Sequence, residues 1–105
     1  AVKELEYLVK SFPESPITSL IHLRLAMIHF QLENYTNALS YALLLDNTEF
    51  ADKGTILAGQ IYEIQEKNIE TSLEQYMKIL NDFTHSIYYE PIRYHVRKLQ
   101  KNEIQ

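Results

Sequence analysis

Residues 25–39, which read LAMIHFQLENYTNAL, return in loosely similar form as residues 58–73, which read AGQIYEIQEKNIETSL. The distance between the two copies is close to 34 residues. A period of this length is typical of stacked pairs of helices, because one pair cannot bury its apolar face alone and needs a neighbour to cover it. Such arrays present a curved surface to partners. The repeat therefore predicts a function in binding rather than in catalysis.

The register of the repeat contains one insertion. Ala26 aligns with Gly59 at a shift of 33 positions, whereas Ala38 aligns with Ser72 at a shift of 34. One residue has therefore been added between the two paired segments. The loops follow the same repeat, since the segment from Phe12 corresponds to residues 83–86 at a shift of 71 positions, or two periods.

Composition limits the fold and the partners. The chain has 105 residues, of which 46% are hydrophobic and 23% charged, and it contains two glycines and three prolines. These values indicate a small domain that is entirely helical. The formal net charge of -4 argues against a nucleic-acid partner, because phosphate contacts need a concentration of Lys and Arg. Cysteine is absent, which excludes disulfides and thiolate metal sites. No apolar run approaches the roughly 20 residues that span a bilayer, so direct membrane insertion is not expected.

Apolar residues spaced three and four positions apart predict about six helices. They are expected at residues 2–12, 16–32, 35–45, 50–65, 69–83 and 86–103. Ser15 is expected to cap the second helix with Pro16 at its first position. Pro91 lies close enough to the start of the last helix to be tolerated there. The helical pattern is already under way at Ala1, so we expect the chain to be a piece of a longer protein.

The repeated segments resemble tetratricopeptide repeats. Small residues recur where paired helices of that family cross most closely, and here they are Ala26, Gly59, Ala38 and Ser72. A large side chain there would push the helix axes beyond the usual spacing of about 8 to 10 Å. The aromatic residue of the turn is matched by Tyr35 and less well by Ile69. The chain departs from the pattern at His22 and Thr55, where a large aromatic is expected, and Pro13 is the only loop proline that matches.

This resemblance implies a right-handed superhelical stack of antiparallel helix pairs, an all-α solenoid that forms a single domain. It divides the chain into the second helix of a truncated repeat, two full repeats and a capping helix, at residues 1–12, 16–47, 50–83 and 86–103. The segments 12–16 and 89–93 are similar to a style of these repeats common in bacterial cell-envelope proteins. The location implied is the bacterial periplasm or cell envelope, with the cytoplasm as the alternative.

The resemblance also implies a binding site, because the first helices of successive pairs line a concave face in that family. The positions that contact ligands there are Leu23, Met27, Phe30, Gln31, Ile56, Gln60, Glu63 and Ile64. Met27 and Phe30 would form an adaptable apolar groove for a peptide or helix of a partner protein. Two alternatives stay open: these residues pack against a neighbouring helix, or the chain is a structural segment that self-associates through its truncated first helix.

No pattern in the chain favours an enzyme, a cofactor or a metal. The four histidines, His22, His29, His85 and His95, form no His-Glu-x-x-His arrangement. Neither a Gly-rich phosphate loop nor a Gly-x-Ser-x-Gly elbow occurs. The last helix collects aromatic and basic residues, namely Tyr88, Tyr89, Arg93, Arg97, Lys98 and Lys101. We interpret it as a solvated capping helix with cations near its negative end, and an acidic partner or RNA is the alternative.

Overall fold

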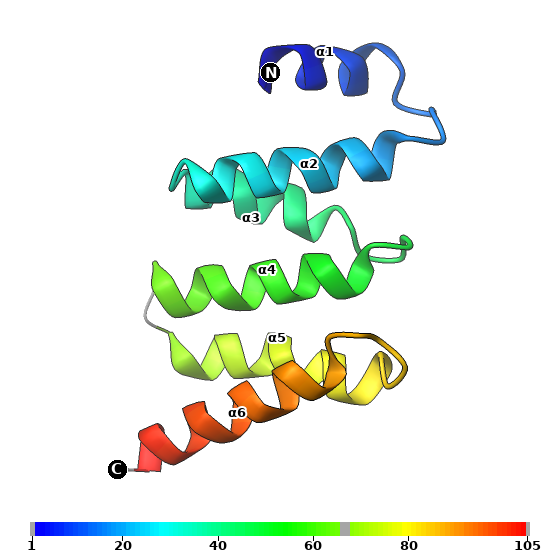
Figure 1. The fold of residues 1–105 in the computed structure, drawn as a ribbon. Coiled ribbons are helices and arrows are strands. Elements are labelled where there is room, and N and C mark those ends of the chain that lie inside the picture. Colours follow the sequence, from blue (N-terminus) through cyan, green and yellow to red (C-terminus); the bar gives the residue numbers. More distant parts are fainter. Residues whose placement is uncertain (1, 66–67, 105) are drawn as a thin grey trace. The chain divides into compact units, whose positions relative to one another are not determined.

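The computed structural model describes residues 2–65 and 68–104, and this part of the chain forms six α-helices and no strand (Figure 1). The helices are α1 (Val2–Ser11), α2 (Thr18–Gln31), α3 (Tyr35–Leu43), α4 (Ala51–Ile64), α5 (Ile69–Asp82) and α6 (Tyr89–Ile104). The predicted all-helical fold and the number of helices are confirmed. Pro91 lies in the first turn of α6, as expected.

The chain divides into two compact units, Ala1–Gly54 and Thr55–Gln105, and the division falls within α4. In the first unit α2 packs against both α1 and α3. In the second unit α5 packs against α6, and Tyr76 of α5 also packs against Gly59 of α4. Each unit is therefore built from consecutive helices that contact their neighbours in the sequence.

The three loops that lead into α2, α4 and α6 share one hydrogen-bond pattern. It centres on a Ser or Thr at an equivalent position in each loop, namely Ser15, Thr48 and Ser86. The amide N–H of this residue donates to a carbonyl three residues earlier, at 3.0 to 3.1 Å. Its hydroxyl accepts from the N–H two residues later, at 3.3, 3.1 and 3.1 Å respectively. Its carbonyl accepts from the N–H three residues later. The loops thus repeat in structure as well as in sequence.

This turn also corrects two predicted helix starts. We expected α2 to begin at Pro16 and α6 near Ser86, but they begin at Thr18 and Tyr89. Ser15 does accept a hydrogen bond from the backbone, as a cap would, but that bond closes the turn before the helix. The α-helical bonds begin only after the turn, so each helix starts two or three residues later than its apolar pattern suggests.

The inserted residue lies in the turn between the paired helices. The N–H of Asn34 donates to the carbonyl of His29 at 2.8 Å, five residues earlier. The N–H of Asn68 donates to the carbonyl of Tyr62 at 3.0 Å, six residues earlier. The bond in the second pair therefore spans one residue more than the bond in the first pair. The shifts of 33 and 34 positions in the sequence have this cause.

The small residues of the repeat lie in the interior of their units. Ala26, Ala38, Gly59 and Ser72 are all buried. A Cβ atom on Gly59 would come within 2.5 Å of the Tyr76 ring, so only glycine allows this approach.

Gly54 also allows a close approach between two segments of the backbone, and the sequence pattern did not identify it. A Cβ atom there would lie 2.8 Å from the carbonyl oxygen of Ala42 and 2.9 Å from the Cβ of Leu45. In the shared loop register, Gly54 takes the place that Ile21 and Ile92 hold in the other two loops. A large residue fits at those two places but not at Gly54, where α4 lies directly against the end of α3.

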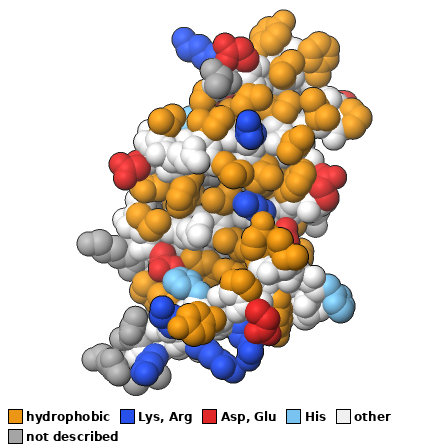
Figure 2. All heavy atoms as spheres, in the orientation of Figure 1, with side chains coloured by type: hydrophobic (Ala, Val, Ile, Leu, Met, Phe, Trp, Pro, Cys, Tyr) orange, Lys and Arg blue, Asp and Glu red, His pale blue; other side chains and the backbone are white. Residues whose placement is uncertain are grey.

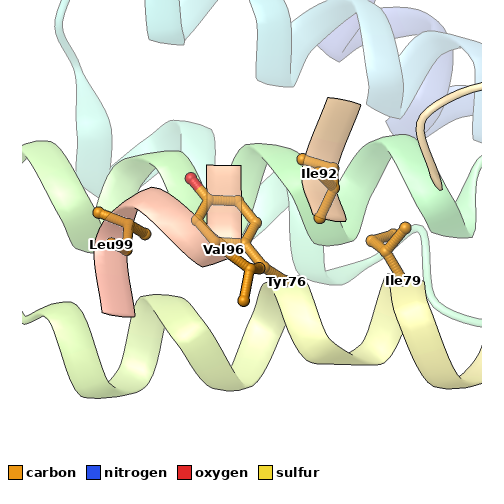
Figure 3. Packing of buried hydrophobic residues seen from close by; sticks show 5 residues of the cluster. All are labelled: Tyr76, Ile79, Ile92, Val96 and Leu99. Atoms are coloured by element: carbon orange, nitrogen blue, oxygen red, sulfur yellow. The ribbon is translucent and has the colours of Figure 1, made fainter. Parts of the chain in front are cut away.

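Each unit has its own buried residues. In the first unit, Leu25 and Leu45 are fully buried. In the second, one cluster joins α5 to α6 and consists of Tyr76, Ile79, Ile92, Val96 and Leu99 (Figure 3). The Tyr76 ring lies among the aliphatic side chains of this cluster.

Candidate functional site

A hollow of about 560 Å³ lies between α1 and α2. Its lining residues are Glu4 and Leu5 from α1, and Arg24, Met27, Ile28 and Gln31 from α2. The four α2 positions are three and four residues apart, so they share one face of that helix. Leu5, Met27 and Ile28 make the hollow partly apolar, and Arg24 and Glu4 add one positive and one negative charge.

The hollow contains one basic and one acidic side chain, Arg24 and Glu4. Arg24 is exposed, is the only formally charged residue of α2, and makes no ion pair within the described residues. Glu4, the carboxylate in the lining, is already engaged in an interaction. Glu6, the other acid of α1, accepts a hydrogen bond from the hydroxyl of Tyr41 at 3.1 Å. Arg24 is therefore the one basic side chain that lines the hollow.

The structure places the four predicted site residues of α2 in different surroundings. Met27 and Gln31 line the hollow. Phe30 is half-buried, and its ring packs edge-on against Tyr35 with the centroids 5.6 Å apart. Leu23 is buried, so the alternative interpretation of a packing residue describes it better than an open groove does. The hollow thus includes two of the four predicted residues of α2. Its other four lining residues were not selected from the sequence, namely Glu4, Leu5, Arg24 and Ile28.

Of the four predicted site residues of α4, two are exposed and two are half-buried. Gln60 and Ile64 are exposed. Ile56 is half-buried and packs against the α5–α6 cluster. Glu63 is half-buried, and its Oε1 accepts a hydrogen bond from the hydroxyl of Tyr76 at 2.7 Å. The carboxylate of Glu63 is therefore committed to a contact within its own unit.

His95 completes this contact. Its Nε2 lies 2.8 Å from the same oxygen of Glu63, and its ring packs edge-on against Tyr76 with centroids 5.3 Å apart. Burial, followed by the hydrogen bond to Glu63, raises the pKa of Tyr76. The three side chains come from α4, α5 and α6 and hold these helices together. Sequence reasoning missed this group because its members are 13 and 32 residues apart and no local pattern connects them.

Helix α1 is the least covered of the described helices. None of its described residues is buried, and Tyr7 and Leu8 are 67% and 39% exposed. A second, shallower hollow of about 380 Å³ lies on this helix, lined by Lys3, Glu4, Tyr7 and Leu8. Figure 2 shows hydrophobic side chains on the surface around the end that carries α1. An exposed apolar surface of this kind usually marks a contact site.

The basic residues of α6 are partly engaged with their own helix. Figure 2 shows Lys and Arg side chains gathered over α6. Arg93 pairs with Glu90 at 3.0 Å, and the Nζ of Lys98 lies 5.2 Å from the centre of the Tyr94 ring. These local contacts agree with a solvated outer helix.

The histidines of the first unit form an aromatic cluster. The ring of His29 is buried and stacks on Tyr41 at 5.7 Å, and His22 contacts the same Tyr41 ring at 5.9 Å. Burial lowers the pKa of His22. Among residues 2–65 and 68–104, no three His, Cys, Asp or Glu side chains come together in a way that could hold a metal ion. In the same part of the chain, every helix is too short or too polar to cross a bilayer.

No family model, no curated protein and no solved structure matches this chain.

Proposed function

We propose that the chain is a non-enzymatic module for protein–protein interaction that binds a helix or peptide of a partner protein. The observation that carries the proposal is the hollow between α1 and α2, which contains the predicted residues Met27 and Gln31. An open, partly apolar concavity on a helical scaffold is suited to a helix that lays its apolar face into a groove. Within this proposal the helix pairs belong to the tetratricopeptide type and form a superhelical stack.

Self-association is the second candidate. It is favoured by the exposure of α1, because no described residue of that helix is buried while Tyr7 and Leu8 are open to solvent. In this alternative α1 of one copy packs against α1 of another. Sedimentation over a range of protein concentrations separates the two functions, since only self-association makes the mass depend on concentration.

The experiment is a selection of helical peptides from a random library against the chain, followed by measurement of their affinities for two variants. Met27→Ala removes an apolar group from the hollow, and we expect it to weaken the selected peptides by about tenfold. Met77→Ala is the matched control, because Met77 is an exposed methionine on α5 in the other unit. Peptides that bind both variants equally well would show that the hollow is not the binding site.

A further inference from the structure

The exposed face of α6 carries a stripe of basic and aromatic side chains. Tyr94, Arg97, Lys98 and Lys101 are three and four residues apart, so they share one face of the helix, and all four are exposed. Figure 2 shows Lys and Arg side chains gathered over this helix. We call these four residues the α6 stripe. It contains three positive charges and no negative one, on a chain whose formal net charge is -4.

The stripe is open because of the residues that α6 itself carries. Counted from the Ser or Thr of the shared loop pattern, Arg97 holds the position of Ala26 in α2 and Gly59 in α4. Those two residues are buried, and a Cβ atom on Gly59 would come within 2.5 Å of the Tyr76 ring in the following helix. Arginine is far larger than glycine, so a helix that followed α6 could not approach this face as closely as α5 approaches α4.

The positive charges of the stripe are not balanced within the described residues. None of its three cations makes an ion pair there. The Nζ of Lys98 lies over the Tyr94 ring, 5.2 Å from its centre. Glu90, one turn before Tyr94, already pairs with Arg93 at 3.0 Å. A partner that brings carboxylates to the stripe would therefore meet complementary charges that the described part of the chain leaves unpaired.

The end of a helical array accounts for only part of this pattern. Cations are favourable in the last turn of a helix, and Lys101 lies there. Arg97 and Lys98 lie earlier in α6, beyond the reach of that effect. A polar cap needs neither a single sign of charge nor an exposed aromatic, yet Tyr94 is 65% exposed. Tyr and Arg are among the residue types enriched at the energetic centres of protein–protein contacts.

We propose that the α6 stripe is a docking surface for an acidic segment of a partner protein. The carboxylates of that segment pair with Arg97, Lys98 and Lys101, and an apolar side chain beside them covers the Tyr94 ring. A nucleic acid is a poorer match, because the stripe is only about 10 Å long and a phosphate backbone that ran beyond it would meet an acidic chain. The stripe shares no residue with the hollow between α1 and α2, so this inference goes beyond the function proposed above.

The probe is a stapled helical peptide of about 14 residues in which glutamates three and four positions apart form one stripe beside a leucine. A second stapled peptide of the same composition distributes its glutamates evenly around the helix and is the matched control. Titration of each peptide into the isotope-labelled chain, followed by NMR, reports both the affinity and the residues that respond.

We expect the striped peptide to shift the amide signals of Tyr94, Arg97 and Lys98 and to bind at least about fivefold more tightly than the control peptide. Arg97→Glu combined with Lys98→Glu should weaken it by at least about tenfold. Lys10→Glu combined with Lys78→Glu makes the same change in net charge at exposed positions outside the stripe, and it should change the affinity by less than about twofold.

A further pair of variants tests the aromatic contact. Tyr94→Ala leaves every charge in place and should weaken the striped peptide by at least about threefold, because it removes an exposed anchor. Tyr7→Ala removes an equally exposed tyrosine from α1 and should leave the affinity unchanged.

Three kinds of outcome would overturn the proposal. Equal binding of both peptides, or equal losses in the two charge-reversed variants, would show attraction by net charge alone. No binding by either peptide would identify the stripe as a polar cap. Tighter binding of an oligouridylate of about 12 nucleotides, or of phosphatidylserine vesicles, would assign the surface to a nucleic acid or a membrane. None of these results bears on the hollow, because Met27→Ala tests that site separately.

Discussion

Helices α1 and α2 of the first unit and helices α5 and α6 of the second unit correspond residue by residue, yet only the second pair is closed. Tyr76 fills the space that α5 shares with α6, and Glu63 joins it to His95. At the corresponding place in the first unit, Leu5 is shorter than Tyr76, Arg24 has no ion-pair partner among the described residues, and a hollow of about 560 Å³ remains. The comparison teaches that corresponding helices of a repeat differ in burial according to what covers them, since Ile79 of α5 is fully buried and Leu8 of α1 is 39% exposed.

The largest difference in stability should come from truncating Tyr76 of α5 and, at the corresponding position of α1, Leu5. Tyr76→Ala deletes a buried aromatic ring that is 1% exposed, and we expect it to lower the free energy of unfolding by about 3 to 5 kcal/mol. Leu5→Ala should lower it by only about 1 kcal/mol, because Leu5 is half-buried and borders an open hollow. Urea unfolding of the two variants measures both values. Equal losses would break the comparison.

Overpacking tests the close helix contact within the first unit. Ala38 is 1% exposed, so Ala38→Leu should destabilise the fold by about 1 to 3 kcal/mol. Thr36→Leu places the same side chain at an exposed position of α3 and serves as the control. A melting midpoint for Ala38→Leu that matches the control would argue against the register of the small residues.

The hydrogen bond from the Tyr76 hydroxyl to Glu63 should contribute a smaller amount to the stability of the second unit. Glu63→Ala leaves the buried hydroxyl of Tyr76 without its acceptor, and we expect the free energy of unfolding to fall by about 1 to 2 kcal/mol. Gln60→Ala, one turn away at an exposed position of α4, should change stability by less than about 0.5 kcal/mol. If the two variants unfold at the same urea concentration, Glu63 does not hold the three helices together.

The smallest effect concerns pH in the first unit. Burial lowers the pKa of His22, so the unfolded chain binds a proton there more readily than the folded protein. The stability that this residue contributes is complete above the unfolded pKa of about 6.5 and is lost as the pH falls from there through the folded pKa. When the pH is lowered from about 7.5 to about 5.5, the melting temperature of His22→Gln should therefore fall by less than that of the parent chain. An identical loss in both proteins would show that the His22 environment is not desolvated.

Sequence periodicity was sufficient to predict the six helices and the alignment of the two repeated segments. Apolar spacing predicted all six helices, and the shift between Ala38 and Ser72 anticipated the longer turn before Asn68. The starts of α2 and α6 were misplaced, because the hydroxyls of Ser15 and Ser86 stabilise a turn that apolar spacing does not register. Local patterns therefore predict the existence of a helix better than its first residue.

The site was only partly predictable for a different reason. Met27 and Gln31 line the hollow between α1 and α2, whereas Leu23 is buried. The hollow depends on Leu5 and Arg24, and their importance emerges only from comparison with Tyr76 and His95. Contacts between side chains 13 to 32 residues apart, such as those of Glu63, leave no periodic signal in one sequence.

Hydrogen exchange of the α1 amides, compared with that of the α5 amides in the same chain, tests the central claim most directly. If α1 is the uncovered counterpart of α5, its amides exchange faster than those of α5 in the chain alone, because few buried contacts oppose local opening. Amides in α1 that are as protected as those in α5 would contradict the account.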